Sequence, residues 1–157
     1  MLRLAAALFT LFALCLSAVA QAQSPVRVTD AWVRATVPTQ RATGAFLKLL
    51  SPETLQLVGV RSPVADVAEI HSTRMKGEVM EMRAVSSVLL PAGVVTELKP
   101  GGFHIMLLQL KMAVTVGQKV PLTLILENDQ HERQEVTVEA YVRPLNARDG
   151  IRNTPEN

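Results

Sequence analysis

Short apolar runs rich in β-branched residues, separated by polar turn-forming clusters, fill most of the chain after residue 25. We predict strands at residues 26–37, 44–50, 55–60, 67–71, 79–85, 103–110, 120–127 and 134–142. No segment after the N-terminal apolar run shows a long 3.6-residue period, so helices are not expected. Strands that recur about every ten residues with Pro, Gly, Asn and Asp between them predict an all-β fold, a Greek-key β-sandwich or barrel in a single domain.

The first 22 residues have the pattern of a secretory signal peptide. Arg3 gives a positive start, residues 4–20 are mostly apolar, and small residues allow cleavage after Ala20 or Ala22. A membrane anchor is disfavoured, because the apolar run is only about seventeen residues long and no basic residues follow it. We therefore expect a periplasmic protein without a membrane span after cleavage. The predicted organisation is a signal peptide (1–22), one folded β domain (23–145) and a polar flexible tail (146–157).

Composition narrows the classes of function. Hydrophobic residues make up 48% and charged residues 19% of the 157 residues, which is enough apolar material for one packed core. The net charge of +2 is scattered and aromatic residues make up only 4%, so nucleic acid is excluded as a partner. The single cysteine, Cys15, lies in the signal peptide. The mature chain can therefore form neither a disulfide nor the thiolate site of a blue-copper electron carrier.

Histidine and methionine are the candidate chemistry of the mature chain. Because residues two apart in a strand share a face, His104 and Met106 project together, as do Met80 and Met82, and His71 ends another strand. Imidazole and neutral thioether ligands without carboxylate favour Cu(I) over zinc, magnesium or calcium. Methionine in a strand is also a common core filler, and an isolated histidine near a turn is commonly inert. Residue types and strand faces alone do not decide between a copper site and methionines that fill the core beside inert histidines.

The spacing of four of these residues matches a known family. Ten residues separate His71 from Met82, twenty-one separate Met82 from His104, and one separates His104 from Met106. This His-x10-Met-x21-His-x-Met pattern resembles the signature of the PCu(A)C periplasmic copper chaperones. Other segments that look like this family are 30–34 (DAWVR), 69–71 (EIH), 77–83 (GEVMEMR), 90–93 (LPAG) and 100–106 (PGGFHIM), within a resemblance over about residues 28–143.

The resemblance implies a cupredoxin-like β-sandwich that binds one Cu(I) per chain through His71, Met82, His104 and Met106. It implies a metallochaperone rather than an enzyme, which releases copper by ligand exchange. The family also implies a recipient, the CuA centre of cytochrome c oxidase subunit II, with Sco-type thiol proteins as further partners.

Two features lie outside the motif. Met75 and Met80 are close to Met82 in sequence, and we expect Met80 to be a neighbour that could stabilise or hand over the metal. Some family members carry a C-terminal extension rich in His and Met that captures Cu(II). Residues 146–157 contain neither residue type, so this second function is not expected here.

Other hypotheses remain open at this level. The chain could be a metal-free exported β-sandwich that acts as an interaction or assembly domain. An exported hydrolase could use Ser72 or Ser87 with a histidine, but no Gly-x-Ser-x-Gly elbow occurs. Scattered glutamates such as Glu69 and Glu81 could form a hard-metal or acid-base group. His131 is expected at a hairpin tip, away from any metal.

Overall fold

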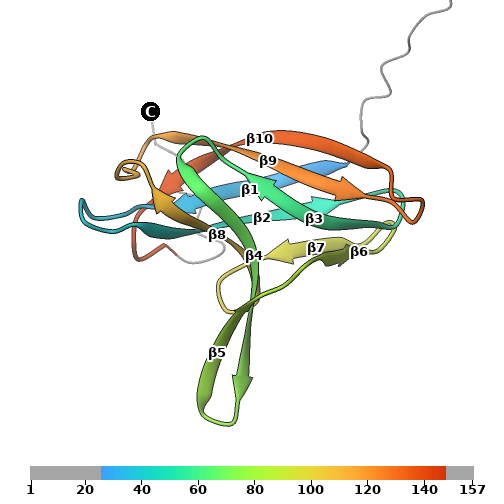
Figure 1. The fold of residues 1–157 in the computed structure, drawn as a ribbon, viewed down its shortest axis with the longest axis horizontal. Coiled ribbons are helices and arrows are strands. Elements are labelled where there is room, and N and C mark those ends of the chain that lie inside the picture. Colours follow the sequence, from blue (N-terminus) through green and yellow to red (C-terminus); the bar gives the residue numbers. More distant parts are fainter. Residues whose placement is uncertain (1–25, 148–157) are drawn as a thin grey trace, which may run out of the picture.

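The computed structural model describes residues 26–147, which form strands and no helix (Figure 1). The strands are β1 (Arg27–Arg34), β2 (Ala42–Leu50), β3 (Leu55–Arg61), β4 (Ala65–Lys76), β5 (Val79–Ala84), β6 (Val88–Leu90), β7 (Val95–Leu98), β8 (Phe103–Leu110), β9 (Lys119–Glu127) and β10 (Arg133–Arg143). No helix in this range is long and apolar enough to cross a membrane. The prediction of an all-β fold is confirmed.

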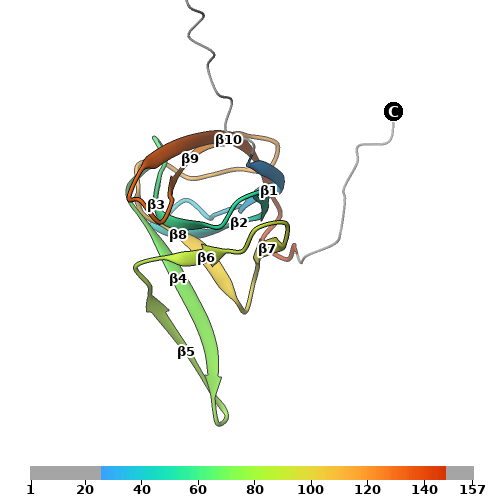
Figure 2. The same cartoon turned by 90° about the vertical axis from the view of Figure 1, so that its right-hand side faces the viewer.

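The strands join into one curved sheet. Hydrogen-bonded neighbours follow the order β5-β4-β8-β2-β1-β10-β9-β3-β6, and β7 pairs with the second half of β2. β1 and β10 run parallel, whereas the other pairs are antiparallel. In Figure 2, β10, β9, β3, β8, β2 and β1 surround a common interior. The sheet is therefore rolled into a barrel-like body.

Alternate residues of the central strands fill the interior. Leu122 and Leu124 of β9 are fully buried there, and so are Ile105 and Leu107 of β8. His104, which precedes Ile105 in the strand, is also buried, but among the polar residues. Strand alternation thus turns Ile105 and Leu107 toward the core and His104 toward the other face. The histidine-bearing face of β8 is thus the outer face of the sheet.

β4 and β5 continue beyond the body as a two-stranded ribbon (Figure 1 and Figure 2). β8 pairs with β4 as far as Ser72, opposite Phe103, and after that β4 pairs only with β5. A two-residue turn closes the ribbon, and Gly77 at its first position has a φ of 64°. This left-handed conformation favours glycine, which suits a tight hairpin. The ribbon carries the sequence that contains Met75, Met80 and Met82.

All the strands predicted from the sequence are present. The structure adds an extension of β4 and two short strands, β6 and β7. β4 continues to Lys76, beyond its predicted end at residue 71, because the ribbon gives it a partner. β6 and β7 were not predicted, since they have only three and four residues and lie next to Pro91 and Gly93. The predicted signal peptide and the tail from residue 148 lie outside the described residues.

Candidate metal site

The two candidate histidines are direct cross-strand partners. In the antiparallel pair of β4 and β8, His71 lies opposite His104, and Ile70 lies opposite Ile105 in the core. Directly opposite residues project to the same face of a sheet. The imidazole ring centroids are 5.9 Å apart. Residues that are 33 positions apart in the sequence therefore meet on the outer face.

Both candidate methionines are diagonal neighbours of His71. Met106 follows His104 by two residues on β8 and lies opposite Glu69, two residues before His71. Met82 on β5 lies opposite Thr73, two residues after His71. Diagonal neighbours in a sheet have Cα atoms about 7–8 Å apart, which long side chains can bridge. The structure thus brings the four predicted residues to one face, with His71 at the centre.

His104 is held firmly. Only 4% of its surface is exposed, and its Nδ1 donates to the carbonyl oxygen of Gly102 at 3.0 Å. Because Nδ1 carries the proton, Nε2 carries the lone pair of the neutral ring. Burial lowers the pKa of His104 below its usual value of 6.5. The hydrogen bond to Gly102 opposes this in part, and the charges of His71 and Arg34 lower the pKa slightly further. The ring is therefore kept neutral, as a metal ligand must be.

One ring nitrogen of His71 is buried and has no hydrogen-bond partner. Its Nε2 lies 2.8 Å from Oε2 of Glu69, and its Nδ1 is buried and has no hydrogen-bond partner. A carboxylate only accepts hydrogen bonds, so in the neutral ring Nε2 carries the proton and Nδ1 the lone pair. Buried polar atoms without a partner are rare and costly. A metal ion bound to Nδ1 would give this buried nitrogen a partner, so His71 fits a metal.

The sulfur side of the site is more open. Met106 is partly buried beside Gly44, its partner on β2, while 54% of Met82 is exposed on the ribbon. Two neutral imidazoles and two thioethers make a soft donor set without charge, which suits Cu(I). Metal could thus reach the site from the side of β5.

A row of rings supports the site from the body of the sheet. Trp32 on β1 and Phe46 on β2 are directly paired, with centroids 4.3 Å apart. The ring of Phe46 is 6.2 Å from His104, and the guanidinium of Arg34 lies 5.5 Å from the centre of Phe46. The row runs across β1, β2, β8 and β4 and ends at His71.

Sequence reasoning missed three supporting residues. The sequence suggests Glu69 for a hard-metal or acid-base group and includes it in the family-like segment 69–71, but not as a partner of the His71 ring. Its position two residues before His71 puts both side chains on one face. Gly44 and Phe46 are likewise two residues apart on β2, so they also share a face. What the sequence lacks is the strand order that places β2 beside β8.

The other candidate residues do not come together into a functional site. His131 lies in the turn between β9 and β10, as predicted, and its Nδ1 is 2.9 Å from Oε1 of Glu127. Ser72 neighbours His71 in the same strand, so the two side chains point to opposite faces, against the hydrolase hypothesis. Within residues 26–147, no cluster of three or more His, Cys, Asp or Glu side chains could hold a metal.

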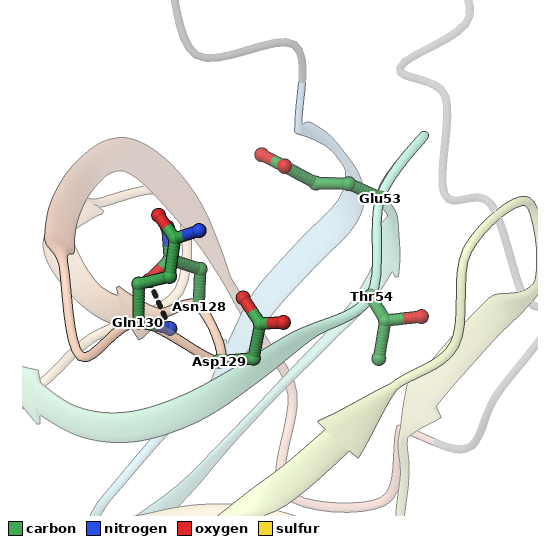
Figure 3. Close-up of a pocket in the computed structure, with 5 residues that line it drawn as sticks. All are labelled: Glu53, Thr54, Asn128, Asp129 and Gln130. Atoms are coloured by element: carbon green, nitrogen blue, oxygen red, sulfur yellow. Dashed lines mark hydrogen bonds between the residues drawn. The ribbon is translucent and has the colours of Figure 1, made fainter.

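A hollow of about 360 Å³ lies between two turns (Figure 3). Glu53 and Thr54 line it from the β2–β3 turn, and residues 128–130 line it from the β9–β10 turn. Asn128 already accepts from the backbone N–H of Gln130 at 3.0 Å, as Figure 3 shows. None of the four candidate metal-binding residues lines this hollow, so it is separate from the histidine pair.

The chain is similar in sequence to a family of proteins named as lipoproteins. Residues 26–142 match the model of the LpqE-like family, which is named for a lipoprotein. The chain is 37% identical over 112 residues to Lxx21020 of Leifsonia xyli subsp. xyli (strain CTCB07), a protein named as a lipoprotein; the match spans 67% of this chain and 68% of that protein.

The chain is also similar to solved structures of copper-bound proteins. The solution structure of Cu(I)-loaded DR1885 from Deinococcus radiodurans is 31% identical, with a TM-score of 0.55, and the match covers 79% of this chain and 83% of that one. The copper-bound PCuAC domain of PmoF2 is 20% identical, with a TM-score of 0.62, and covers 76% of this chain and 92% of that one; at this identity it shows the fold alone. The fold is therefore the cupredoxin-like fold of PCuAC domains. The chain belongs to the LpqE-like family, a relative of the PCuAC proteins.

Proposed function

We propose that this protein is a copper carrier that binds one Cu(I) through His71, Met82, His104 and Met106. The observation that carries the proposal is the buried, unpartnered Nδ1 of His71, which lies on the same face as its cross-strand partner His104. Two thioethers on that face complete a neutral, soft donor set. The Cu(I)-bound state of DR1885, which is 31% identical, supports the choice of metal.

Release would proceed by ligand exchange rather than by a catalysed reaction. Four neutral ligands leave the bound ion with a single positive charge, so no ligand has to be protonated before it leaves. Met82 is the most exposed of the four and lies on a two-stranded ribbon. An acceptor would therefore approach the bound ion from the side of Met82, where the site is most exposed.

We further propose that the protein acts in the periplasm after its signal peptide is removed, and that the recipient is the CuA centre of cytochrome c oxidase subunit II, with Sco-type proteins as partners. The lipoprotein names of its relatives support an exported location. The recipient rests on the family resemblance of the motif.

A competition titration with a Cu(I)-specific chelator tests the metal site. The purified protein should bind one equivalent of Cu(I), and Met82→Leu or Met106→Leu should weaken binding by about tenfold or more, which is about 1.4 kcal/mol. Met112→Leu is the matched control, because 68% of Met112 is exposed in the segment after β8, outside the motif. Equal affinity of all three variants, or no binding by the unaltered protein, would overturn the proposal.

The recipient is tested separately. Cu(I)-loaded protein is mixed with the metal-free CuA domain of subunit II, the two are separated, and the copper in each is measured. We expect copper to move to the CuA domain faster than to a CuA domain whose cysteine ligands are replaced by serine. Retention of copper on the carrier in both mixtures would rule out this recipient while leaving the copper site intact.

A further inference from the structure

The methionine-bearing face of the β4–β5 ribbon extends away from the histidine pair. Met75 lies directly opposite Met80, and Thr73 lies directly opposite Met82. Since residues two apart share a face, Met75, Met80 and Met82 project to the same side as His71. The three sulfur-bearing side chains therefore form a continuous row from the histidines toward the turn at Gly77.

Met75 and Met80 do not fill a hydrophobic core. Met75 is 62% exposed and Met80 is 63% exposed, on a ribbon that packs no second layer of sheet. Apolar side chains stabilise a fold through the area they remove from water, so these two contribute little to stability. Their exposure calls for another explanation.

The charged residues of the ribbon lie on its opposite face. Glu81 is paired with Arg74 in register, and its carboxylate contacts Lys76 at 3.6 Å and Arg83 at 2.8 Å. The methionine face of the ribbon is thereby left without a carboxylate. A surface that offers three thioethers and no carboxylate selects a soft monovalent ion, Cu(I) or Ag(I), over zinc, magnesium or calcium.

We propose that Met75, Met80 and Met82 form a second, thioether-only site for a soft monovalent metal. Directly paired residues have Cβ atoms about 4.5–5.5 Å apart, and three rotatable bonds let each methionine sulfur converge on a shared ion. This inference builds on the proposed central site, because Met82 belongs to both ligand sets. Metal can then pass between the outer site and the histidines by exchanging ligands around Met82, without leaving the protein.

The outer site binds more weakly than the central one. It has three neutral sulfur ligands and no imidazole, and it lies on an exposed ribbon where water competes. Cu(I) or Ag(I) therefore occupies the central site first. A second ion binds Met75 and Met80 and draws Met82 to itself, which leaves the first ion on the two imidazoles and Met106. On release the order is reversed, and the outer methionines hold the ion where an acceptor can reach it.

Methionine methyl resonances test this directly. The protein is labelled with 13C at the methionine methyl groups and titrated with Ag(I), a redox-inert substitute for Cu(I). The first equivalent should shift Met82 and Met106, and the second should shift Met75, Met80 and again Met82. The Met112 methyl, which lies outside both sites, should not move.

The double variant Met75→Leu/Met80→Leu should lose the second-equivalent shifts and keep those of the first. From this variant a Cu(I)-specific chelator should also remove the first metal ion more slowly than from the Met112→Leu control.

If the Met75 and Met80 resonances do not shift in the titration while that of Met106 does, the outer site is overturned and the central site stands. If Met106 never moves while Met75 and Met80 do, the central site is overturned and the outer site stands. A Met112 shift that follows the same titration curve as Met75 would overturn the outer site as non-specific thioether binding.

Discussion

At the scale of single residues, Glu69 determines which nitrogen of His71 is free for a metal. Its carboxylate accepts from Nε2 at 2.8 Å and leaves the lone pair on Nδ1. Carboxylates that orient a metal-binding histidine typically change metal affinity by about 10–100-fold when they are removed. We expect Glu69→Ala to weaken Cu(I) binding within this range, measured by chelator competition.

Glu69→Gln is the matched variant, because its side-chain oxygen can still accept from Nε2. It should retain most of the affinity that Glu69→Ala loses. If Glu69→Ala binds Cu(I) as tightly as the unaltered protein, the carboxylate has no role in orienting His71.

His104 should make the metal-free protein less stable in mild acid. Burial lowers the pKa of His104 in the folded state, whereas the unfolded chain keeps the usual value of 6.5. The unfolded state then binds more protons, so the free energy of unfolding falls as the pH is lowered through about 6.5 toward the folded pKa. The urea midpoint of the metal-free protein should decrease between about pH 7.5 and pH 5.5.

His104→Gln isolates this contribution from the other titrating groups. The variant should show a smaller decrease of the urea midpoint over the same pH range, because its side chain does not titrate. Equal decreases in the two proteins would assign the pH dependence to other groups.

At the scale of the elements, β2 supports the site through a glycine and an aromatic ring on one face. A Cβ atom placed on Gly44 would lie 2.8 Å from Cζ of Phe46. The ring of Phe46 is held between Trp32 and His104 and has little room to move. We expect Gly44→Ala to destabilise the protein by about 1–3 kcal/mol, as overpacking does in buried sites.

The measurement is urea unfolding followed by the fluorescence of Trp32, the single tryptophan. Gly59→Ala is a useful comparison, since its added Cβ would lie 3.2 Å from a methyl group of Ile125, away from the histidines. Gly44→Ala should lower both stability and Cu(I) affinity, whereas Gly59→Ala should change stability alone. A Gly44→Ala variant with normal stability would show that Phe46 moves freely.

The alternation of side chains within strands could be inferred from the sequence, but the pairing between strands could not. A period of two placed His104 with Met106 and Met80 with Met82, because it depends only on local backbone geometry. The partnership of His71 and His104 depends on β4 lying beside β8, which is fixed by long-range packing. Only the family resemblance linked these residues before the structure was known.

At the scale of the whole molecule, the sheet order explains why distant residues converge. β4 and β8 are separated in sequence by β5, β6 and β7, yet they are neighbours in the sheet. β6 and β7 pair with β3 and β2, so the chain crosses the body between the ribbon and β8. These strands are too short for a sequence pattern to reveal them. The rest of the body follows from the long apolar runs, which the sequence shows clearly.

Because the candidate ligands come from three strands, copper should stabilise the fold as a whole. A ligand that binds only the folded state adds about 2.7 kcal/mol of stability when its free concentration is 100 times its Kd. For a domain of this size that corresponds to a rise in Tm of roughly 10 °C. We expect this rise when Cu(I), buffered by a chelator, is added to the protein under anaerobic conditions and unfolding is followed by circular dichroism.

The size of the shift in variants identifies which strands the metal joins. His71→Ala removes the ligand on β4, and Met106→Leu removes one of the two on β8, so each should reduce the copper-induced rise in Tm. Met112→Leu should keep it in full, because Met112 contributes to neither proposed site. An undiminished rise in Tm for His71→Ala would mean that copper stabilises the protein from somewhere other than the histidine pair.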